Sequence, residues 1–174
     1  MVENLHAPND VTDRQTGAVT EERPFVRLNL ATGELATGND WDIAFKGTTI
    51  IVNGGSANDG VTRTGNAAAV VMTGIFEEME QAPEAAAFRQ DTENELAIPK
   101  GGGNGWYNYD PQNHLITPIA GRVLFVRTHN NNYAKLEVLS YYKAAPASPD
   151  AFRDQSATFT FRYIYQPDGS NTLK

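Results

Sequence analysis

The alternation of apolar and polar residues along the chain predicts a series of β-strands. Residues 25–30 and 41–45 alternate strictly, which is typical of strands with one buried face. Residues 48–52 form a β-branched run and residues 67–76 have a similar composition, so both stretches also favour extended structure. Polar, glycine-rich segments over residues 53–60 and 100–105 predict loops between the strands.

The C-terminal third carries the clearest pattern, a predicted β-hairpin. Residues 122–127 and 133–139 flank a tip that contains three consecutive asparagines, which favour the left-handed backbone of a tight turn. In the second arm Ala134, Leu136 and Val138 share one face, while Lys135 and Glu137 share the other. Residues 158–165 predict a further strand. Its four aromatic residues at alternate positions are expected on one face that is mainly buried, and they are Phe159, Phe161, Tyr163 and Tyr165.

Helical signals are scarce elsewhere in the chain. Residues 77–90 are rich in Glu, Ala and Met and predict the one short helix, which Pro83 limits to a turn or two on either side. Residues 1–23 are polar and lack periodicity, so we expect a flexible N-terminal arm followed by a single domain over residues 24–174. The predicted fold class is all-β, with mostly antiparallel sheets and hairpins and at most one short helix.

Composition and charge exclude several classes of function. The 174 residues carry a net charge of −7 and no basic cluster longer than two residues, so no nucleic-acid partner and no anionic membrane surface is expected. The absence of cysteine removes disulfides and thiolate sites, and no apolar run is long enough to be a transmembrane segment. The polar N-terminus does not resemble a signal peptide, so the chain is either cytoplasmic or a mature form whose signal has been removed.

The sequence also lacks the motifs of common enzymes. It contains no Gly-x-Ser-x-Gly, no His-Glu-x-x-His and no phosphate-binding loop. Glu77, Glu78 and Glu80 could imitate a pair of catalytic carboxylates, but clustered charges are usually a solvated surface. We therefore expect a binding protein and not an enzyme.

An ordered series of segments resembles the HmuY family of haem-binding surface proteins from Bacteroidetes. No single segment decides the resemblance, and their order and spacing from about residue 24 to residue 166 carry it. The segments are Trp41-Asp42-Ile43-Ala44-Phe45, Asn53-Gly54-Gly55, Trp106-Tyr107-Asn108-Tyr109, Arg122-Val123-Leu124-Phe125-Val126-Arg127, Tyr133-Ala134-Lys135-Leu136 and Phe159-Thr160-Phe161-Arg162-Tyr163.

The resemblance implies an all-β fold with finger-like extensions that grip haem. It also implies a lipoprotein made with a signal peptide and a lipidated cysteine, which are absent here, so this chain would be a mature fragment at the outer-membrane surface or outside the cell. Members of the family pass haem toward an outer-membrane receptor. They ligate iron through His or Met side chains on two segments, one before the motif at Trp106 and one shortly after it.

Only one of those two ligand segments has a clear counterpart in this sequence. His114 follows the motif and is the candidate axial ligand, whereas the segment before Trp106 is short and contains no histidine. Met79 is the candidate for the second ligand, with Met72 as the alternative, although Met72 also suits a core position. His129, at the asparagine-rich tip, is interpreted as a solvated histidine. The expected pocket has aromatic walls from Trp106, Tyr107 and Tyr109 and a cation for the haem propionates from Lys100 or Arg89.

Two functions therefore remain open from the sequence. The first is a haemophore-like surface protein that binds haem and delivers it to an outer-membrane receptor. The second is an interaction or scaffold module of the same fold that does not ligate haem and binds another ligand or protein, because a fold does not fix a function.

Overall fold

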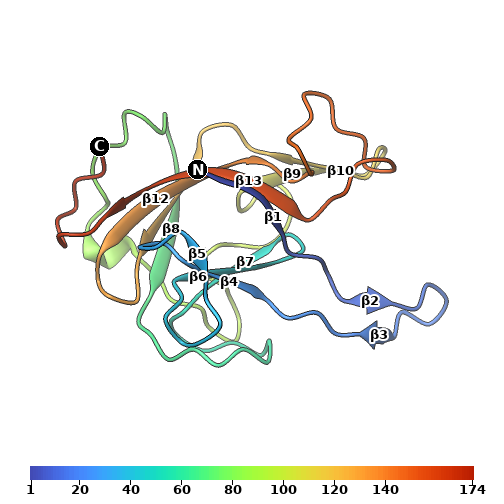
Figure 1. The fold of residues 1–174 in the computed structure, drawn as a ribbon, viewed down its shortest axis with the longest axis horizontal. Helices are drawn as coiled ribbons and strands as arrows, with labels where there is room; N and C mark the ends of the chain where they lie inside the picture. The colour runs from blue at the N-terminus through green and yellow to red at the C-terminus, as the bar shows by residue number, and fades with distance from the viewer.

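The computed structural model describes all residues from 1 to 174, and Figure 1 shows two β-sheets facing one another. All strands pair antiparallel. The five-stranded sheet contains, in spatial order, β1 (Val2–His6), β13 (Thr158–Gln166), β12 (Tyr133–Ser140), β11 (Arg122–Arg127) and β8 (Ala68–Thr73). The four-stranded sheet contains β5 (Glu34–Leu35), β4 (Val26–Asn29), β6 (Ile43–Lys46) and β7 (Thr49–Val52).

Two further hairpins extend from this body toward the right of Figure 1. One hairpin pairs β9 (Tyr107–Asp110) with β10 (Leu115–Pro118), and the other pairs β2 (Val11–Thr12) with β3 (Val19–Glu21). Every residue of β2 and β3 is exposed, so this second hairpin is a projection without a packed face. The all-β prediction is confirmed, and no helix in the structure has the length and apolar character needed to cross a bilayer.

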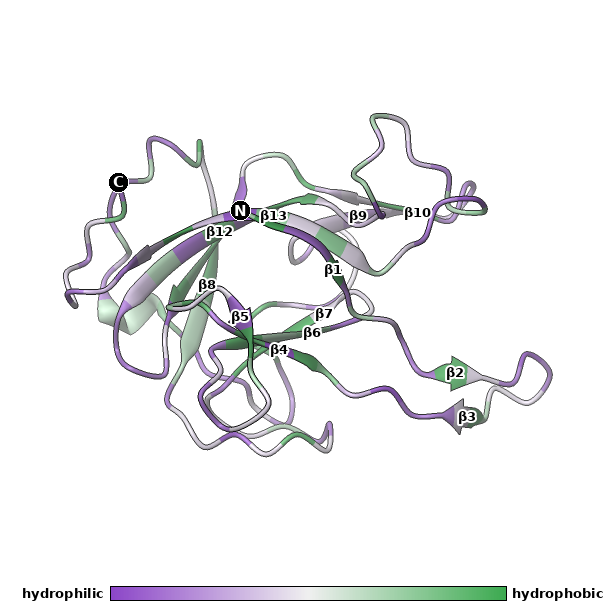
Figure 2. Ribbon diagram, in the orientation of Figure 1, coloured by the Kyte–Doolittle hydropathy of each residue, from purple (hydrophilic) through white to green (hydrophobic).

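The main core lies between the two sheets and contains 24 buried residues, which come from both sheets and from the segments that connect their strands. Phe45 of β6 packs its ring against Phe159 and Phe161 of β13, with ring centroids 4.9 and 5.5 Å apart. Figure 2 shows hydrophobic residues along β6, β7 and β13. They alternate with polar residues at the start of β13, but they are consecutive in β6 and β7, because Ala44 and Ile51 on the second face of these strands are buried against Trp41. The predicted aromatic face of β13 is confirmed: Phe159 and Phe161 are fully buried, while Tyr163 and Tyr165 are half-buried against the same core.

The predicted hairpin at the asparagine-rich tip is also confirmed. Leu124 pairs with Leu136 and Val126 with Ala134, and Asn131 in the turn has a φ of 62°. This left-handed value is one that asparagine tolerates better than most residues, which is the reason for the sequence signal.

The face of the five-stranded sheet that points away from the main core is buried as well. The sequence did not predict this burial, because Lys135 and Glu137 lie on that face. Lys135 is completely buried, and its ammonium group donates hydrogen bonds to the carbonyl oxygens of Phe76 and Met79 at 2.6 and 3.0 Å. Burial lowers the pKa of Lys135, against the attraction of nearby glutamates. The segment around residues 75–80 therefore covers this face and closes a second, smaller core with Phe88 and Phe125.

The predicted helix over residues 77–90 is wrong. The segment contains only a short 3₁₀ turn at Ala85–Ala87, and the rest is irregular. Pro83 cannot donate the backbone hydrogen bond that a helix needs. The backbone here bonds instead to the C-terminal segment, because the amide of Ala82 donates to Asn171 O at 2.7 Å and that of Leu173 to Glu80 O at 2.6 Å.

The N-terminal residues are more ordered than their polar composition indicates. Strand β1 pairs with β13 at the edge of the larger sheet, and Leu5 and Ala7 are buried. The sequence analysis predicted an arm from residue 1 and did not predict strand β1. The pairing partner of β1 is β13, which lies more than 150 residues away in the sequence. The flexibility of the residues that follow, up to residue 23, stays a prediction.

Candidate ligand-binding site

His114 lies in the turn that connects β9 to β10, a hairpin that the sequence analysis did not predict. The carboxylate of Asp110 organises this turn by accepting hydrogen bonds from the amide of Gln112 at 2.9 Å and from Asn113 Nδ2 at 2.7 Å. His114 itself has a φ of 54°, a left-handed value that is uncommon for residues other than glycine. The turn therefore holds the histidine at the tip of a projecting hairpin.

The imidazole of His114 is exposed and is oriented by a neighbouring tyrosine. Its Nδ1 lies 2.8 Å from the hydroxyl of Tyr109, and the ring of Phe152 packs edge-on against it with centroids 5.8 Å apart. Tyr109 is 45% exposed and Phe152 77% exposed. Nε2 of His114 makes no hydrogen bond within the protein. The structure thus presents one free imidazole nitrogen beside two solvent-facing aromatic rings, which we call the His114 patch.

Trp106 and Tyr107 do not form the walls of a pocket. Trp106 is 1% exposed, and its Nε1 donates to the carbonyl oxygen of Thr48 at 3.0 Å. Its ring packs against Tyr107, Tyr141 and Phe159 within the main core. These two residues of the Trp106 motif therefore anchor the start of β9, while Tyr109 is the aromatic residue of the motif that faces solvent.

Met79 and Trp106 lie on opposite sides of the five-stranded sheet. Trp106 is part of the main core on one side, and Met79 packs on the other side. It packs against the second core, and its neighbour Glu80 pairs with the C-terminal segment at the left of Figure 1, whereas β9 and β10 lie at the right. Met72, at the end of β8, pairs with Val123 and is 37% exposed. The structure therefore does not bring either methionine next to His114.

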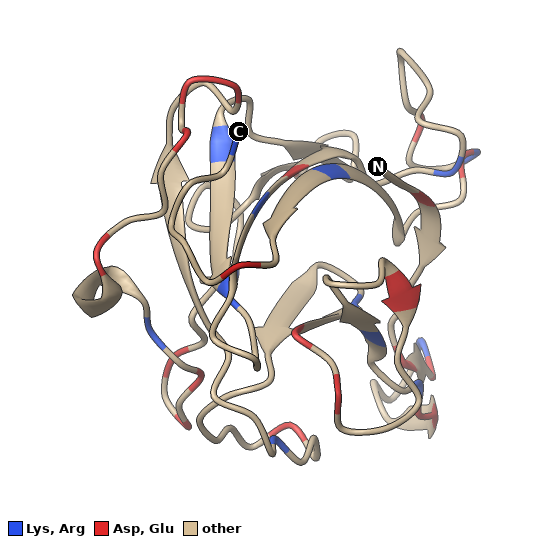
Figure 3. Ribbon diagram, turned by 60° about the vertical axis from the view of Figure 1, so that its left-hand side comes forward, with Lys and Arg blue, Asp and Glu red and all other residues tan.

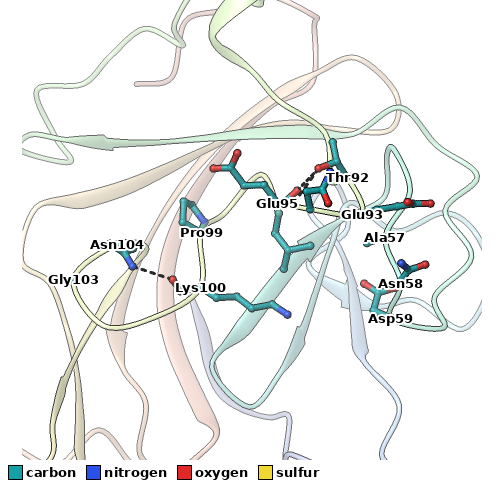
Figure 4. A pocket seen from close by; sticks show the side chains of 12 residues that line it. Ala57, Asn58, Asp59, Thr92, Glu93, Glu95, Pro99, Lys100, Gly103 and Asn104 are labelled. Carbon is teal, nitrogen blue, oxygen red and sulfur yellow. Dashed lines mark hydrogen bonds between the residues drawn. The ribbon is translucent and has the colours of Figure 1, made fainter.

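Lys100 is exposed and lines a cavity of about 690 Å³, shown in Figure 4. The cavity lies between the loop that follows β7, the loop before Ala97, and the loop that leads to β9. Its lining is polar with only two hydrophobic residues, and comprises Ala57, Asn58, Asp59, Thr92, Glu93, Asn94, Glu95, Leu96, Pro99, Lys100, Gly103 and Asn104. The sequence analysis predicted the loops at residues 53–60 and 100–105, but not that they meet around one cavity, because nothing in a single sequence shows which loops lie together.

The other two histidines have structural partners. His129 is not the solvated residue that its asparagine-rich surroundings indicated, because its Nδ1 lies 2.7 Å from the buried carboxylate of Asp42. His6 is exposed, and its Nδ1 lies 3.1 Å from the hydroxyl of Thr158. His114 is thus the one histidine that combines exposure with flanking aromatic rings.

Comparison with protein families identifies the fold. The model of the HmuY protein family matches residues 21–163. The chain belongs to the HmuY family. Comparison with curated proteins gives no match.

Solved structures share the HmuY fold with this chain at low sequence identity. A candidate HmuY-like haem-binding protein from Bacteroides vulgatus is 18% identical, with a TM-score of 0.52 and coverage of 94% of this chain and 97% of the other. A candidate lipoprotein from Bacteroides fragilis is 17% identical, with a TM-score of 0.52 and coverage of 82% and 86%. These similarities confirm the predicted architecture of this HmuY family member.

Proposed function

We propose that this HmuY family protein binds haem at the bacterial surface and delivers it toward an outer-membrane receptor, as a haemophore and not as an enzyme. Membership of a family with haem-binding members supports the ligand class. The single observation that carries the proposal for this chain is the His114 patch.

The His114 patch fits one face of haem. Haem iron accepts a neutral imidazole nitrogen, and a hydrogen bond to the other ring nitrogen fixes the orientation of the ligand. The hydroxyl of Tyr109 occupies Nδ1 and leaves Nε2 free, so Nε2 of His114 is the atom that would hold the iron. Tyr109 and Phe152 supply exposed apolar surface for the porphyrin, because aromatic rings favour such contacts.

The second axial ligand predicted from the sequence has no support in this geometry. Met79 packs on the second core and Met72 lies at the end of β8, so neither shares the His114 patch. We therefore propose His114 as the axial ligand from this chain, with the other position open. The cavity at Lys100 does not suit the macrocycle, because haem pockets are mainly apolar and this lining is not.

The proposed location follows from the same family. A lipid-anchored precursor would place the protein at the outer-membrane surface, where it could meet a receptor. The charge distribution does not favour this location over any other. Lys and Arg are interspersed with Asp and Glu over the strands and loops and form no basic face (Figure 3). Transfer to a receptor also favours a single, exposed axial ligand, since a weakly enclosed haem is easily released.

The test is titration of the purified protein with oxidised and reduced haem, recorded as the visible spectrum. We expect a Soret band for the wild-type protein, and its loss or shift for His114→Ala. His6→Ala is the matched control, because His6 is also exposed but has no flanking aromatic rings. Phe152→Ala should weaken binding without changing the position of the band.

Absence of any Soret change with the wild-type protein would reject haem binding and favour the second candidate, a scaffold module of the HmuY fold. A Soret band that His114→Ala leaves unchanged would reject only the ligand assignment. In that case methionine ligation by Met72 or Met79 becomes the assignment to test, with Met72→Ala and Met79→Ala measured in parallel.

A further inference from the structure

The cavity in Figure 4 is separate from the His114 patch and has a rigid base. The side chain of Arg63 is almost fully buried, and it pairs with Asp59 of the cavity lining at 2.6 Å and with the buried carboxylate of Asp91 at 2.9 Å. Asp91 also accepts hydrogen bonds from the amides of Val52 and Ala97. These contacts tie the end of β7 to two of the cavity walls.

Short-range hydrogen bonds also hold the loop before Ala97 and the loop at Lys100. The hydroxyl of Thr92 donates to the carbonyl oxygen of Glu95 at 2.9 Å and accepts from the Glu95 amide at 3.0 Å. Asn104 Nδ2 donates to Lys100 O at 3.3 Å (Figure 4). The cavity is therefore largely formed before any ligand arrives, which lowers the entropic cost of binding.

Several polar side chains of the lining have no partner within the protein. The amides of Asn58 and Asn94, the carboxylate of Glu93 and the ammonium group of Lys100 make no hydrogen bond or ion pair. In Figure 4 the side chain of Lys100 extends toward the loop that carries Asn58 and Asp59. The carboxylate of Asp59, in contrast, is occupied by Arg63. The carboxylate of Glu95 also lines the cavity and pairs with Arg89 at 3.4 Å. The groups without a partner therefore include two amides and one charge of each sign.

A second cavity of about 270 Å³ adjoins the first, because Asp59 and Lys100 line both. It adds the amide of Asn9 and the hydroxyl of Thr49, together with the ring of Phe25 and the ion pair of Lys46 with Asp10. Together the two cavities form a polar groove that is longer than a single small ligand needs. We refer to it as the Lys100 groove.

The outer edge of β7 offers an extended peptide little free backbone for strand addition. Both ends of this edge are occupied, since Thr48 O accepts from Trp106, and the amide and carbonyl of Val52 bond to Asp91 and Arg63. Peptides that bind without strand addition usually need apolar pockets for their side chains, which this lining lacks. A ligand with many hydroxyl groups and little net charge matches the available amides best.

We propose that the Lys100 groove binds a neutral oligosaccharide, with Asn58 and Asn94 bonding to its hydroxyl groups. The amide of each asparagine offers both a donor and an acceptor, and vicinal hydroxyl groups of a sugar can satisfy both. Lys100 and Glu93 add one further donor and one further acceptor from opposite sides of the same cavity.

The experiment is a titration of the ¹⁵N-labelled protein with maltohexaose, cellohexaose, mannohexaose and N-acetylchitotetraose in the millimolar range. With at least one of these sugars we expect amide shifts confined to residues 57–59, 92–96 and 99–104. The double variant Asn58→Ala/Asn94→Ala should weaken that binding by about tenfold or more. Asn171→Ala is the matched control, because Asn171 is an exposed asparagine outside the groove. The affinity of this variant for the sugar should equal that of the wild type.

Absence of shifts with all four sugars, or shifts that map outside the three loops, would overturn the proposal. Shifts in these loops with trialanine but with none of the sugars would also overturn it, in favour of a peptide ligand. The result is independent of haem, because His114→Ala leaves the groove intact and should retain the sugar response.

Discussion

The carboxylate of Asp42 holds His129 through two hydrogen bonds that join the two sheets. Asp42 Oδ1 accepts from the backbone amide of His129 at 2.9 Å and lies 2.7 Å from its Nδ1. The other oxygen of Asp42 accepts from the amide of Leu30 at 2.7 Å. Asp42 precedes β6 of the four-stranded sheet, and His129 lies in the turn between β11 and β12 of the other sheet. One buried side chain thus connects both layers at one end of the molecule.

Asp42→Ala should destabilise the fold more than His129→Ala. Loss of the carboxylate leaves buried donors unsatisfied, each at a cost of about 1–3 kcal/mol, so we expect a total of about 3 kcal/mol or more. His129→Ala removes one side-chain hydrogen bond and should cost about 1 kcal/mol. Urea unfolding of the two variants measures both values. Equal effects, or a negligible effect of Asp42→Ala, would show that the two sheets do not depend on this contact.

Phe161→Ala should lower the free energy of unfolding by about 3–5 kcal/mol, because it opens a cavity in the main core. Phe152→Ala is the control, since Phe152 is 77% exposed and its truncation should leave the melting temperature nearly unchanged. Thermal unfolding followed by circular dichroism compares the two. An unchanged melting temperature for Phe161→Ala would contradict the inward orientation of this face of β13.

The Asp59–Arg63 pair predicts a pH dependence of stability. Burial opposes ionisation of Asp59, but hydrogen bonds from Arg63 outweigh it and hold the pKa of Asp59 below its ordinary value of 3.8. A lowered folded-state pKa contributes stability above the unfolded value and loses it as the pH falls through the folded value. The difference in unfolding free energy between the wild type and Asp59→Asn should therefore be largest near neutral pH and shrink below about pH 4. A difference that stays constant down to pH 2 would exclude this linkage.

Deletion of residues 1–7 should destabilise the protein by about 2–4 kcal/mol, because it removes an edge strand and the buried side chain of Leu5. The amide of Ala7 donates to Ala157 O at 2.7 Å, and Ala7 O accepts from Gly47, so both backbone partners are lost.

Replacement of residues 11–21 by a short glycine linker is the contrasting variant. This projecting hairpin has no buried side chain, so its removal should leave the unfolding midpoint in urea within error of the wild type. If the deletion of residues 1–7 were as harmless as this replacement, β1 would not be part of the stable sheet.

Local sequence patterns determined most of the strands. Period-two alternation identified β4, β6, β12 and β13, because the core between the sheets selects apolar side chains at alternate positions regardless of which strands become neighbours. Strand β11 is instead a continuous apolar run, because it is buried on both faces. The asparagines of the hairpin tip likewise act locally, through the backbone conformation that Asn131 adopts. The order of motifs along the chain was sufficient to indicate the HmuY family. The role of His114 as an iron ligand, predicted from its position after Trp106, stays a prediction.

Only the tertiary structure decided the surroundings of these residues. Lys135 and Glu137 occupy the alternate positions that a solvated face would have, and they are buried because a distant segment folds over them. Strand β1 has no apolar alternation of its own and exists through its pairing with β13. The separation of Met79 from His114, and the meeting of three loops at Lys100, likewise depend on contacts between residues far apart in the sequence. A local sequence pattern predicts which side chains of a strand are buried against a core. The residues that contact those side chains are determined by the packing of the whole chain.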